Sequence, residues 1–259
     1  VLLIRVLNPL VLIRFYSFSS EVIGIFASVT ELYLCRRDLN LDSRRTFDIF
    51  YHNREPSNLQ LKKMWDRKLR VWGLARQVDA LNRTFPGGNR HIIQMPEFAD
   101  RDISGLLPRT PVHLSFTSDE EHLGREELLA MGVPEGTHFV CFYSRDSKYK
   151  EVMNPESDSN IYSQRDSNIH NHVSAAEEMT RRGYYAIRLG AIVKEPLQTT
   201  NPMVIDYATN YRSDFMDIYL CAKCYFCIGD ETGFNRVPSI FRRPLANLNV
   251  IPIDQVHTQ

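Results

Sequence analysis

Three short polar motifs in the second half of the chain carry side chains suited to binding a phosphorylated ligand. In chain order they read Ser144-Arg145-Asp146, Arg188-Leu189-Gly190 and Asp230-Glu231-Thr232-Gly233. Arginine holds phosphate in a planar, bidentate fork. The third motif is an acidic turn that precedes a helix-like segment, whose first backbone N–H groups lie at the positive end of the helix dipole. The motifs predict an anion site wherever the fold brings them together.

The elements around these motifs predict an open, mostly parallel α/β sheet. Apolar runs typical of buried strands occur at residues 137–143, 184–187, 204–207, 225–228 and 248–253. Helical patterns occur from within residues 115–121 to about 131, at 173–182 and at 213–223. The first opens with a capping-box pattern, in which Thr117 or Ser118 caps and Glu120 or Glu121 completes the box. Ligands of such sheets bind beyond the carboxyl ends of the strands, where all three motifs would lie. The alternative is that Arg145 and Arg188 only pair with nearby carboxylates such as Asp146.

The first half of the chain predicts a second α/β unit. Strand patterns occur at residues 10–15 and 47–51, and residues 22–35 fit a helix that continues as helix or strand. The apolar start, residues 1–18, is too interrupted for a transmembrane helix and predicts a buried strand pair.

A long helix is expected at residues 57–83. Its predicted apolar face consists of Leu61, Met64, Trp65, Trp72 and Ala75, and its basic face is either solvated or in contact with an anionic membrane.

Length and charge indicate two domains. A chain of 259 residues fits about two domains. Residues 1–111 hold 17 Lys or Arg and 11 Asp or Glu, an excess of six positive charges, and residues 112–259 hold the remaining 14 and 20, an excess of six negative charges. Pro108 and Pro111 mark the expected linker. The polar stretch at residues 147–171 is expected to be a long loop that is either functional or mobile.

No metal site is expected from the sequence. Five cysteines without a regular framework favour a reducing compartment. Cys221, Cys224 and Cys227 have the spacing of part of an iron–sulfur motif, but a helix that runs into a strand would point their thiols in different directions, so we interpret them as free, buried cysteines. His170-Asn171-His172 and Asp100-Arg101-Asp102 are interpreted as loop segments rather than metal ligands.

A set of ordered motifs from about Phe116 to Pro252 resembles a family of bacterial glycosyltransferases associated with surface polysaccharide synthesis. The motifs are Phe116-Thr117, Gly132-Val133-Pro134-Glu135-Gly136, Val140 to Ser147, Tyr185 to Gly190, Asp206-Tyr207-Ala208 and Arg212 to Asp217. The resemblance implies a GT-B-like fold, with two Rossmann-like domains facing a cleft. It implies that residues 112–259 bind a nucleotide-sugar donor and that residues 1–111 bind the acceptor, a cell-surface glycan or lipid-linked molecule.

The resemblance also implies roles for single residues. Donor binding falls to the three motifs, through Ser144, Arg145, Asp146, Arg188, Gly190, Asp230, Glu231, Thr232 and Gly233. Arg145 and Arg188 would bind the diphosphate, and the glycine turn would stabilise the leaving group in place of a metal. Glu31 is the candidate base for the acceptor hydroxyl. No cofactor besides the nucleotide-sugar co-substrate and no nucleic-acid partner are expected, and the basic helix 57–83 would bring a cytoplasmic protein to the inner face of the membrane.

Two departures from the family pattern favour an alternative. Members often carry a histidine where this chain has Ile25, and they continue past Gln259, so the chain is expected to lack a C-terminal segment. The alternative is a catalytically degenerate module that binds a sugar nucleotide or a phosphate. A dehydrogenase ranks third, because no G-x-G-x-x-G pattern follows a predicted strand.

Overall fold

The computed structural model divides the chain into two compact units. It describes residues 1–41, 45–95, 101–153 and 163–250. Unit 1 comprises Val1–Ser115, and unit 2 comprises Phe116–Thr258. The division falls four residues after the boundary expected from the charge change.

Unit 1 is built on a parallel strand pair. β1 (Leu12–Phe18) pairs with β2 (Thr46–His52) in the register Leu12↔Thr46 to Phe18↔His52. A parallel pair needs a crossover, and α2 (Ile23–Asp38) supplies it. The remaining helices are α1 (Leu2–Val6), α3 (Leu59–Lys68), α4 (Ala75–Arg83) and the 3₁₀ turns η1 (Gly88–His91) and η2 (Leu107–Arg109). The strand pair expected within residues 1–18 is wrong, because this segment forms α1 and β1.

The helix expected over residues 57–83 is also wrong as a single element. The chain leaves the helix at Leu69, which has extended backbone angles, and then pairs with β2: Phe50 N donates to the Arg70 carbonyl at 2.9 Å, and Trp72 N donates to the Phe50 carbonyl at 2.9 Å. The predicted apolar face is buried at Leu61, Met64, Trp65 and Ala75, whereas Trp72 is 47% exposed. The hydrogen bonds offered by β2 thus outweigh the helical pattern between α3 and α4.

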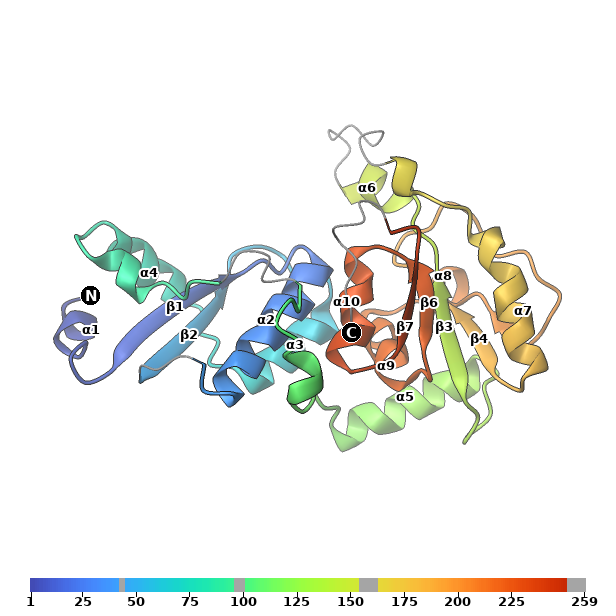
Figure 1. Ribbon diagram of the computed structural model, residues 1–259, viewed down its shortest axis with the longest axis horizontal. Helices are drawn as coiled ribbons and strands as arrows, with labels where there is room; N and C mark the ends of the chain where they lie inside the picture. Colours follow the sequence, from blue (N-terminus) through green and yellow to red (C-terminus); the bar gives the residue numbers. More distant parts are fainter. Residues whose placement is uncertain (42–44, 96–100, 154–162, 251–259) are drawn as a thin grey trace. The chain divides into compact units, whose positions relative to one another are not determined.

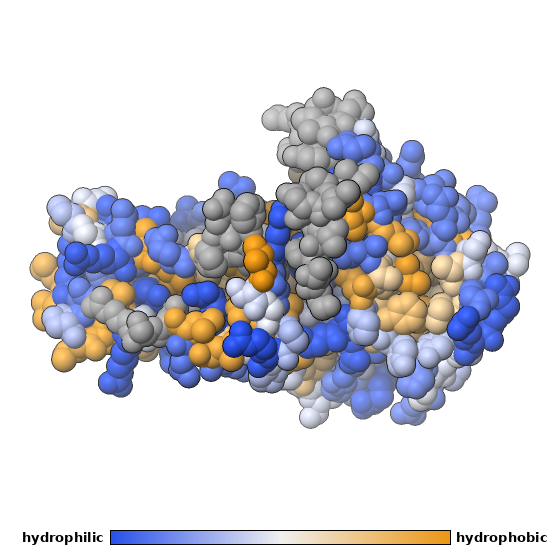
Figure 2. Space-filling model, viewed as in Figure 1, coloured by the Kyte–Doolittle hydropathy of each residue, from blue (hydrophilic) through white to orange (hydrophobic). Residues whose placement is uncertain are grey.

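Unit 1 exposes large apolar side chains near α1 and α4. They are Leu2, Val6, Leu10, Leu74, Leu81 and Phe85. Arg5 of α1 joins the two elements, since its Nη2 donates to Asn82 Oδ1 of α4 at 3.3 Å. Figure 2 shows hydrophobic residues at this end of the unit among hydrophilic ones. No helix among the described residues has the length and apolar character needed to span a bilayer.

Unit 2 contains a five-stranded, fully parallel sheet in the order β5-β4-β3-β6-β7 (Figure 1). The strands are β3 (Phe139–Tyr143), β4 (Tyr185–Arg188), β5 (Val204–Ile205), β6 (Cys227–Asp230) and β7 (Leu245–Leu248). The chain moves from β3 through β4 to β5 on one side and returns through β6 to β7 on the other. The strand order therefore reverses between β3 and β6, as in a Rossmann-like sheet. The predicted mostly parallel α/β sheet is confirmed.

Helices cover both faces of this sheet. They are α5 (Ser118–Ala130), α6 (Lys148–Met153), α7 (Val173–Arg181), α8 (Tyr207–Asn210), α9 (Asp214–Lys223) and α10 (Arg236–Ile240), with the 3₁₀ turns η4 (Ile169–His172) and η5 (Gly233–Asn235). Val140 and Phe142 pack with Ala176 of α7, whereas the alternate residue Tyr143 contacts Asn235 on the other face. The capping box at Thr117 and Glu120 is confirmed.

Three boundaries in unit 2 differ from those expected. β6 begins at Cys227, so Gly229 and Asp230 belong to the strand and not to the turn. β7 ends at Leu248, where the last strand was expected to start, and residues 251–259 lie outside the described chain. The loop expected at residues 147–171 contains α6 and η4.

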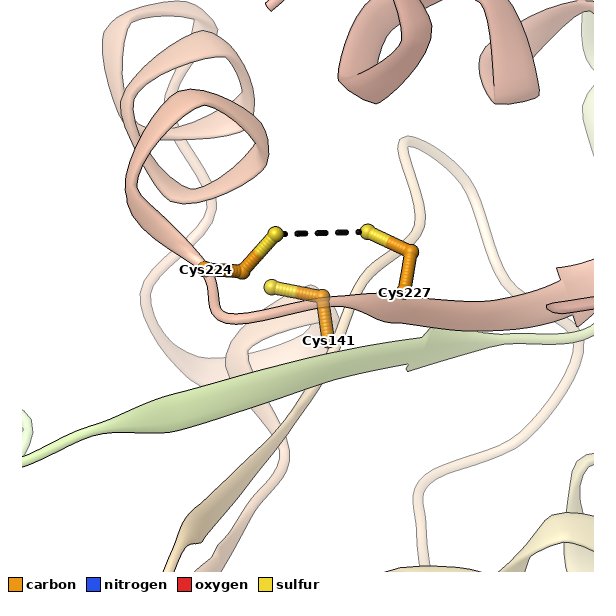
Figure 3. A group of neighbouring side chains, drawn as sticks. All are labelled: Cys141, Cys224 and Cys227. Carbon is orange, nitrogen blue, oxygen red and sulfur yellow. Dashed lines mark hydrogen bonds between the residues drawn. The ribbon is translucent and has the colours of Figure 1, made fainter. Parts of the chain in front are cut away.

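The expected divergence of the cysteine thiols is wrong as well. Cys224 ends α9 in an extended conformation, so the chain turns directly into β6 and the Cys224 thiol faces that of Cys227, with the sulfurs 3.5 Å apart. Cys141 on β3 is the register partner of Cys227. Figure 3 shows the three thiols converging between the end of α9 and the two strands.

Candidate ligand site at the carboxyl edge of the larger sheet

A polar pocket lies at the carboxyl ends of β3 and β4. Its volume is about 270 Å³, and it is lined by Ser144, Asp146, Ser147, Asp166, Ser167, Asn168, Ile169, Arg188, Lys194 and Glu195. Three of these, Ser144, Asp146 and Arg188, are residues that the sequence predicted for the site. Ligand pockets typically measure about 300 to 1,000 Å³, so this one matches a phosphate or sugar-phosphate group better than a whole nucleotide sugar.

Arg188 is the last residue of β4 and is almost fully enclosed. Its Nη1 donates to the Glu195 carbonyl at 2.8 Å and lies 3.3 Å from Asp206 Oδ1. Its Nε has no hydrogen-bond partner among the described residues. Asp206 also accepts a bond from Leu197 N at 2.8 Å, so it fixes both the arginine and the loop after β4. Arg188 thus pairs with a carboxylate, as expected if it has a structural role, and it also borders the pocket.

Arg145 lies beside the pocket rather than in its lining. Its Nε donates to Asp166 Oδ1 at 3.0 Å, so its partner is not the expected Asp146. Asp146 instead accepts from two backbone amides, Lys148 N at 2.9 Å and Lys194 N at 3.1 Å. These bonds join the loop after β3 to the loop after β4.

Asp230 is a fully buried junction between four segments. Its Oδ2 accepts from Arg145 N at 2.9 Å and Ser167 Oγ at 2.5 Å and lies 3.6 Å from His172 Nε2, while Oδ1 accepts from Asn249 Nδ2 at 2.6 Å. Burial by itself raises the pKa of this carboxyl, but the bonds from His172, Ser167 and the Arg145 amide hold its pKa below the usual 3.8. Asp230 is therefore ionised and positions the pocket residue Ser167 from behind.

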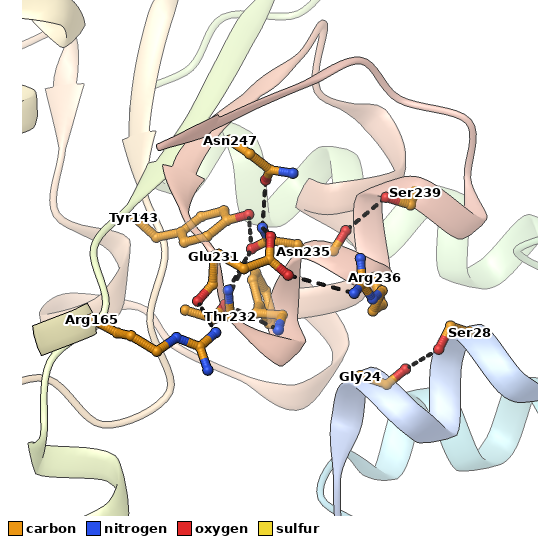
Figure 4. A network of polar contacts seen from close by, with 11 residues as sticks. Gly24, Ser28, Tyr143, Arg165, Glu231, Thr232, Asn235, Arg236, Ser239 and Asn247 are labelled. Atoms are coloured by element: carbon orange, nitrogen blue, oxygen red, sulfur yellow. Dashed lines mark hydrogen bonds and ion pairs between the residues drawn. The ribbon is translucent and has the colours of Figure 1, made fainter. Parts of the chain in front are cut away.

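The rest of the acidic turn is also occupied by internal contacts (Figure 4). Glu231 Oε2 accepts from Asn235 Nδ2 at 2.9 Å, and the Glu231 carbonyl accepts from Arg165 Nη2 at 2.9 Å. Thr232 caps η5 by accepting from Phe234 N at 3.1 Å, and the next helix, α10, has only five residues. The helix-like segment expected behind the turn is present as the 3₁₀ turn η5, which Gly233 opens, followed by the short helix α10.

Two glycines near the pocket are needed for close packing. A Cβ on Gly229 would lie 2.2 Å from the ring of Tyr143, whose hydroxyl donates to Asn235 Oδ1 at 2.7 Å. A Cβ on Gly190 would lie 2.5 Å from Val193 Cγ1. Gly190, predicted as a ligand contact, therefore shapes the loop after β4 and does not line the pocket.

The sequence missed several pocket residues, above all Ser167 and Lys194. Ser167 comes from the polar stretch that was marked only for its length. Lys194 is exposed, and its ammonium makes no ion pair with any residue that the structure describes. The only sequence feature that could have identified Lys194 is its position six residues after the end of β4.

Glu31 lies in α2 and is fully buried. Its Oε1 is 2.9 Å from His113 Nδ1, and His113 Nε2 is 2.9 Å from Asp38 Oδ2. Burial by itself lowers the pKa of His113, but contacts with Cys35, Glu31 and Asp38 raise it to about 10. Glu31 thus faces a buried imidazolium, which favours a structural role, since a general base must reach the acceptor hydroxyl. Its catalytic role stays a prediction.

Asp102, the second aspartate of the Asp100-Arg101-Asp102 segment, has a structural role. Asp102 accepts from Leu106 N at 2.6 Å and from Leu107 N at 2.8 Å and so caps η2. Asp100 lies outside the described residues.

Comparisons with known proteins show similarity in fold alone. No protein-family model and no curated protein matches the chain. A solved structure of a glycosyl transferase family 9 protein from Veillonella parvula DSM 2008 is 9% identical, with a TM-score of 0.50 over 92% of this chain and 79% of that one. The E. coli ADP-heptose lps heptosyltransferase II is 10% identical, with a TM-score of 0.49 over 91% of this chain and 84% of that one. The chain has the α/β, GT-B-like fold that the sequence predicted.

Proposed function

We propose that the protein is a glycosyltransferase that moves a sugar from a nucleotide-activated donor to a cell-surface glycan or lipid-linked acceptor. The observation that supports this best is the polar pocket beside the strand-order reversal of the larger sheet, in a fold shared with a family 9 glycosyl transferase. Ligands of open α/β sheets bind beyond the carboxyl ends of the strands, and β3, which borders the pocket, is one of the two strands at the reversal. Unit 2 is the proposed donor-binding unit and unit 1 the proposed acceptor-binding unit.

The donor diphosphate is proposed to bind at the Lys194 side of the pocket. Lys194 supplies an ammonium without an ion-pair partner among the described residues, and Ser144 supplies a hydroxyl donor. The hydroxyls of Ser147 and Ser167 already donate to Glu151 and Asp230, so in the pocket they serve as acceptors. Arg188, held by Asp206, adds positive charge from the pocket wall. Fixed positive charge at this place would stabilise the leaving nucleoside diphosphate, and in this proposal the transfer itself needs no metal.

The pocket carboxylates suit the sugar half of the donor. Asp146, Asp166 and Glu195 line the same pocket, and ionised carboxylates accept hydrogen bonds from sugar hydroxyls. Arg145, Asp230, Glu231 and Thr232, expected to touch the phosphates, instead support the pocket loops in this proposal. The base that activates the acceptor is not assigned to Glu31, because His113 encloses it.

Peripheral binding to the inner membrane face is proposed for unit 1. Exposed basic residues of the 57–83 segment, Lys63, Lys68, Arg70 and Arg76, lie in the same segment as the exposed apolar side chains Leu74 and Leu81. Each Lys or Arg near an anionic surface contributes about 1 kcal/mol. Cosedimentation with vesicles, with and without phosphatidylserine, tests this contact.

The degenerate binding module is the second candidate, and a specific observation favours it. Both predicted phosphate-binding arginines have carboxylate partners, Arg145 with Asp166 and Arg188 with Asp206. Such a module would bind the donor without turning it over.

Calorimetry with nucleoside diphosphates and nucleotide sugars tests the donor site. Lys194→Ala should weaken binding by about 10- to 100-fold, as expected for a lost charge-assisted hydrogen bond. The matched control is Arg181→Ala, which removes an exposed positive charge from α7, outside the pocket lining. Equal affinity of Lys194→Ala and the unchanged protein would refute the donor site. Donor binding without turnover across a panel of acceptors would select the degenerate module.

A further inference from the structure

Unit 2 contains a compact cluster of buried thiols that the donor pocket does not use. Cys141, Cys224 and Cys227 are each fully buried, and their three sulfurs lie within 4.8 Å of one another (Figure 3). They come from three places in the chain: β3, the end of α9 and the first residue of β6. A C-x-x-C pair and a third cysteine from a neighbouring strand are thus held together by the fold.

We propose that Cys141, Cys224 and Cys227 form a binding site for a thiophilic metal ion, Zn²⁺ or Cu⁺. Bonds from such ions to thiolate sulfur measure about 2.3 Å, and three sulfurs evenly placed around one ion at that length lie about 4.0 Å apart. The observed spacing, from 3.5 Å for Cys224 and Cys227 up to the 4.8 Å limit for the trio, brackets this value. Metal binding therefore needs only small side-chain adjustments.

The chemistry of the trio selects the class of ion. Thiolates are soft ligands that favour Zn²⁺, Cu⁺ and iron–sulfur clusters, whereas Mg²⁺ and Ca²⁺ need oxygen ligands. Three sulfurs suffice for a trigonal Cu⁺ site. Structural Zn²⁺ takes four ligands, and the buried Cys221 of α9, three residues before Cys224, is a source of a fourth sulfur.

One positive charge lies next to the thiols. The positive charge of Arg243 acts on Cys224 and Cys227, and its Nε donates to the Ala222 carbonyl at 2.7 Å, next to the cluster in the chain. Arg243 thus offsets part of the negative charge of a metal–thiolate complex.

The site has a clear structural consequence. Cys141 and Cys227 are register partners on β3 and β6, the two strands between which the strand order reverses. Three residues further along each strand, the chain reaches Ser144 and Asp230 at the pocket edge. A bound ion would tie the two strands together and stabilise the folded unit in proportion to its concentration relative to Kd.

Metal binding to the full chain tests the proposal. We expect native mass spectrometry of the reduced protein to show one Zn²⁺ or one Cu⁺ per chain. Cys224→Ser and Cys227→Ser should each weaken the binding by more than about 100-fold, since even residues that only orient metal ligands contribute about 10- to 100-fold. Cys221→Ser distinguishes the two ions, because it should weaken Zn²⁺ binding and leave Cu⁺ binding unchanged.

Cys35→Ser is the matched control. Cys35 is a buried cysteine of unit 1 that lies near Glu31 and His113 in a second group of potential ligands, and its replacement should leave the metal affinity unchanged. If Cys35→Ser abolishes binding, the ion belongs to that second group and the proposal is wrong.

A second measurement needs no variant and so does not depend on whether a variant folds. The unchanged protein is alkylated with and without Zn²⁺ or Cu⁺ under mild denaturant, and the modified cysteines are mapped by peptide mass spectrometry. Protection of Cys141, Cys224 and Cys227 by either ion supports the site. Failure of both ions to bind at one per chain, or equal alkylation of these cysteines with and without metal, would overturn it.

Discussion

Two polar regions at the carboxyl edge of the larger sheet differ in what their side chains are free to do. The acidic segment Asp230-Glu231-Thr232, at the end of β6 and just after it, uses its polar groups in internal bonds, and Asp230 alone contacts Arg145, Ser167, His172 and Asn249. The pocket after β3 and β4 leaves Lys194 without an ion-pair partner among the residues described. Position at a strand end therefore does not make a residue a ligand contact. A residue at a strand end is available to a ligand only when its side chain is not already bonded to another part of the protein.

The largest effect is expected from Asp230→Ala. It would leave three buried or half-buried donors, Arg145 N, Ser167 Oγ and Asn249 Nδ2, without an acceptor, so the free energy of unfolding should fall by about 3 to 5 kcal/mol. Urea unfolding measures this. The control Glu135→Gln changes an exposed carboxylate and should stay within about 0.5 kcal/mol. If Asp230→Ala lowers the free energy of unfolding by less than about 1 kcal/mol, Asp230 is not the structural residue that distinguishes the acidic segment from the pocket.

The pH dependence of stability compares Asp230 in unit 2 with the buried pair Glu31 and His113 in unit 1. The folded-state pKa of Asp230 is depressed, so its contribution to stability is present above 3.8 and is lost as pH falls below that value. The pKa of His113 is raised to about 10, so its contribution is present in full below 6.5 and is lost as pH rises toward 10. Urea midpoints from pH 3 to 10 should decline at both ends, and His113→Gln should flatten only the alkaline decline.

A smaller loss is expected from Gly229→Ala. The new methyl group would meet the Tyr143 ring, and overpacking of this kind costs about 1 to 3 kcal/mol. Gly73→Ala is the matched control, because a Cβ there has no atom within 4 Å. Equal thermal midpoints for the two variants would show that β3 and β6 can separate at little cost.

The smallest change in stability is expected from Lys194→Ala, in contrast to the large loss of donor binding that the proposed function predicts for it. An exposed lysine without an ion-pair partner among the described residues should contribute less than about 0.5 kcal/mol to stability. Urea unfolding measures this. If Lys194→Ala lowers the free energy of unfolding as much as Asp230→Ala does, Lys194 has a structural role, and the proposed difference between the pocket and the acidic segment is wrong.

The sequence predicted those features that depend on local patterns. Apolar runs identified β3 and β4, and Thr117 with Glu120 identified the start of α5, because strand burial and helix caps are decided within a few residues. The edge of the sheet was therefore predictable, and with it the positions of Ser144, Asp146 and Arg188.

Features that depend on distant partners could not be predicted. Leu69 leaves the helical pattern because β2 offers hydrogen bonds, and Asp230 is withdrawn from the pocket because His172 and Ser167 reach it. The cysteine spacing was visible, but the contribution of Cys141 required the pairing of β3 with β6. In each case the deciding neighbour lies many residues away in the chain.

The bonds that the amides of Lys148 and Lys194 donate to Asp146 have a consequence for protein engineering. The loops after β3 and β4 should be exchanged together, because Asp146 of the first loop holds the backbone of Lys194 in the second. A chimera that receives only one loop from a relative would misalign the lysine, whereas a chimera that receives both would preserve its alignment. Attempts to alter ligand preference should therefore transplant residues 144–148 and 190–197 as a pair.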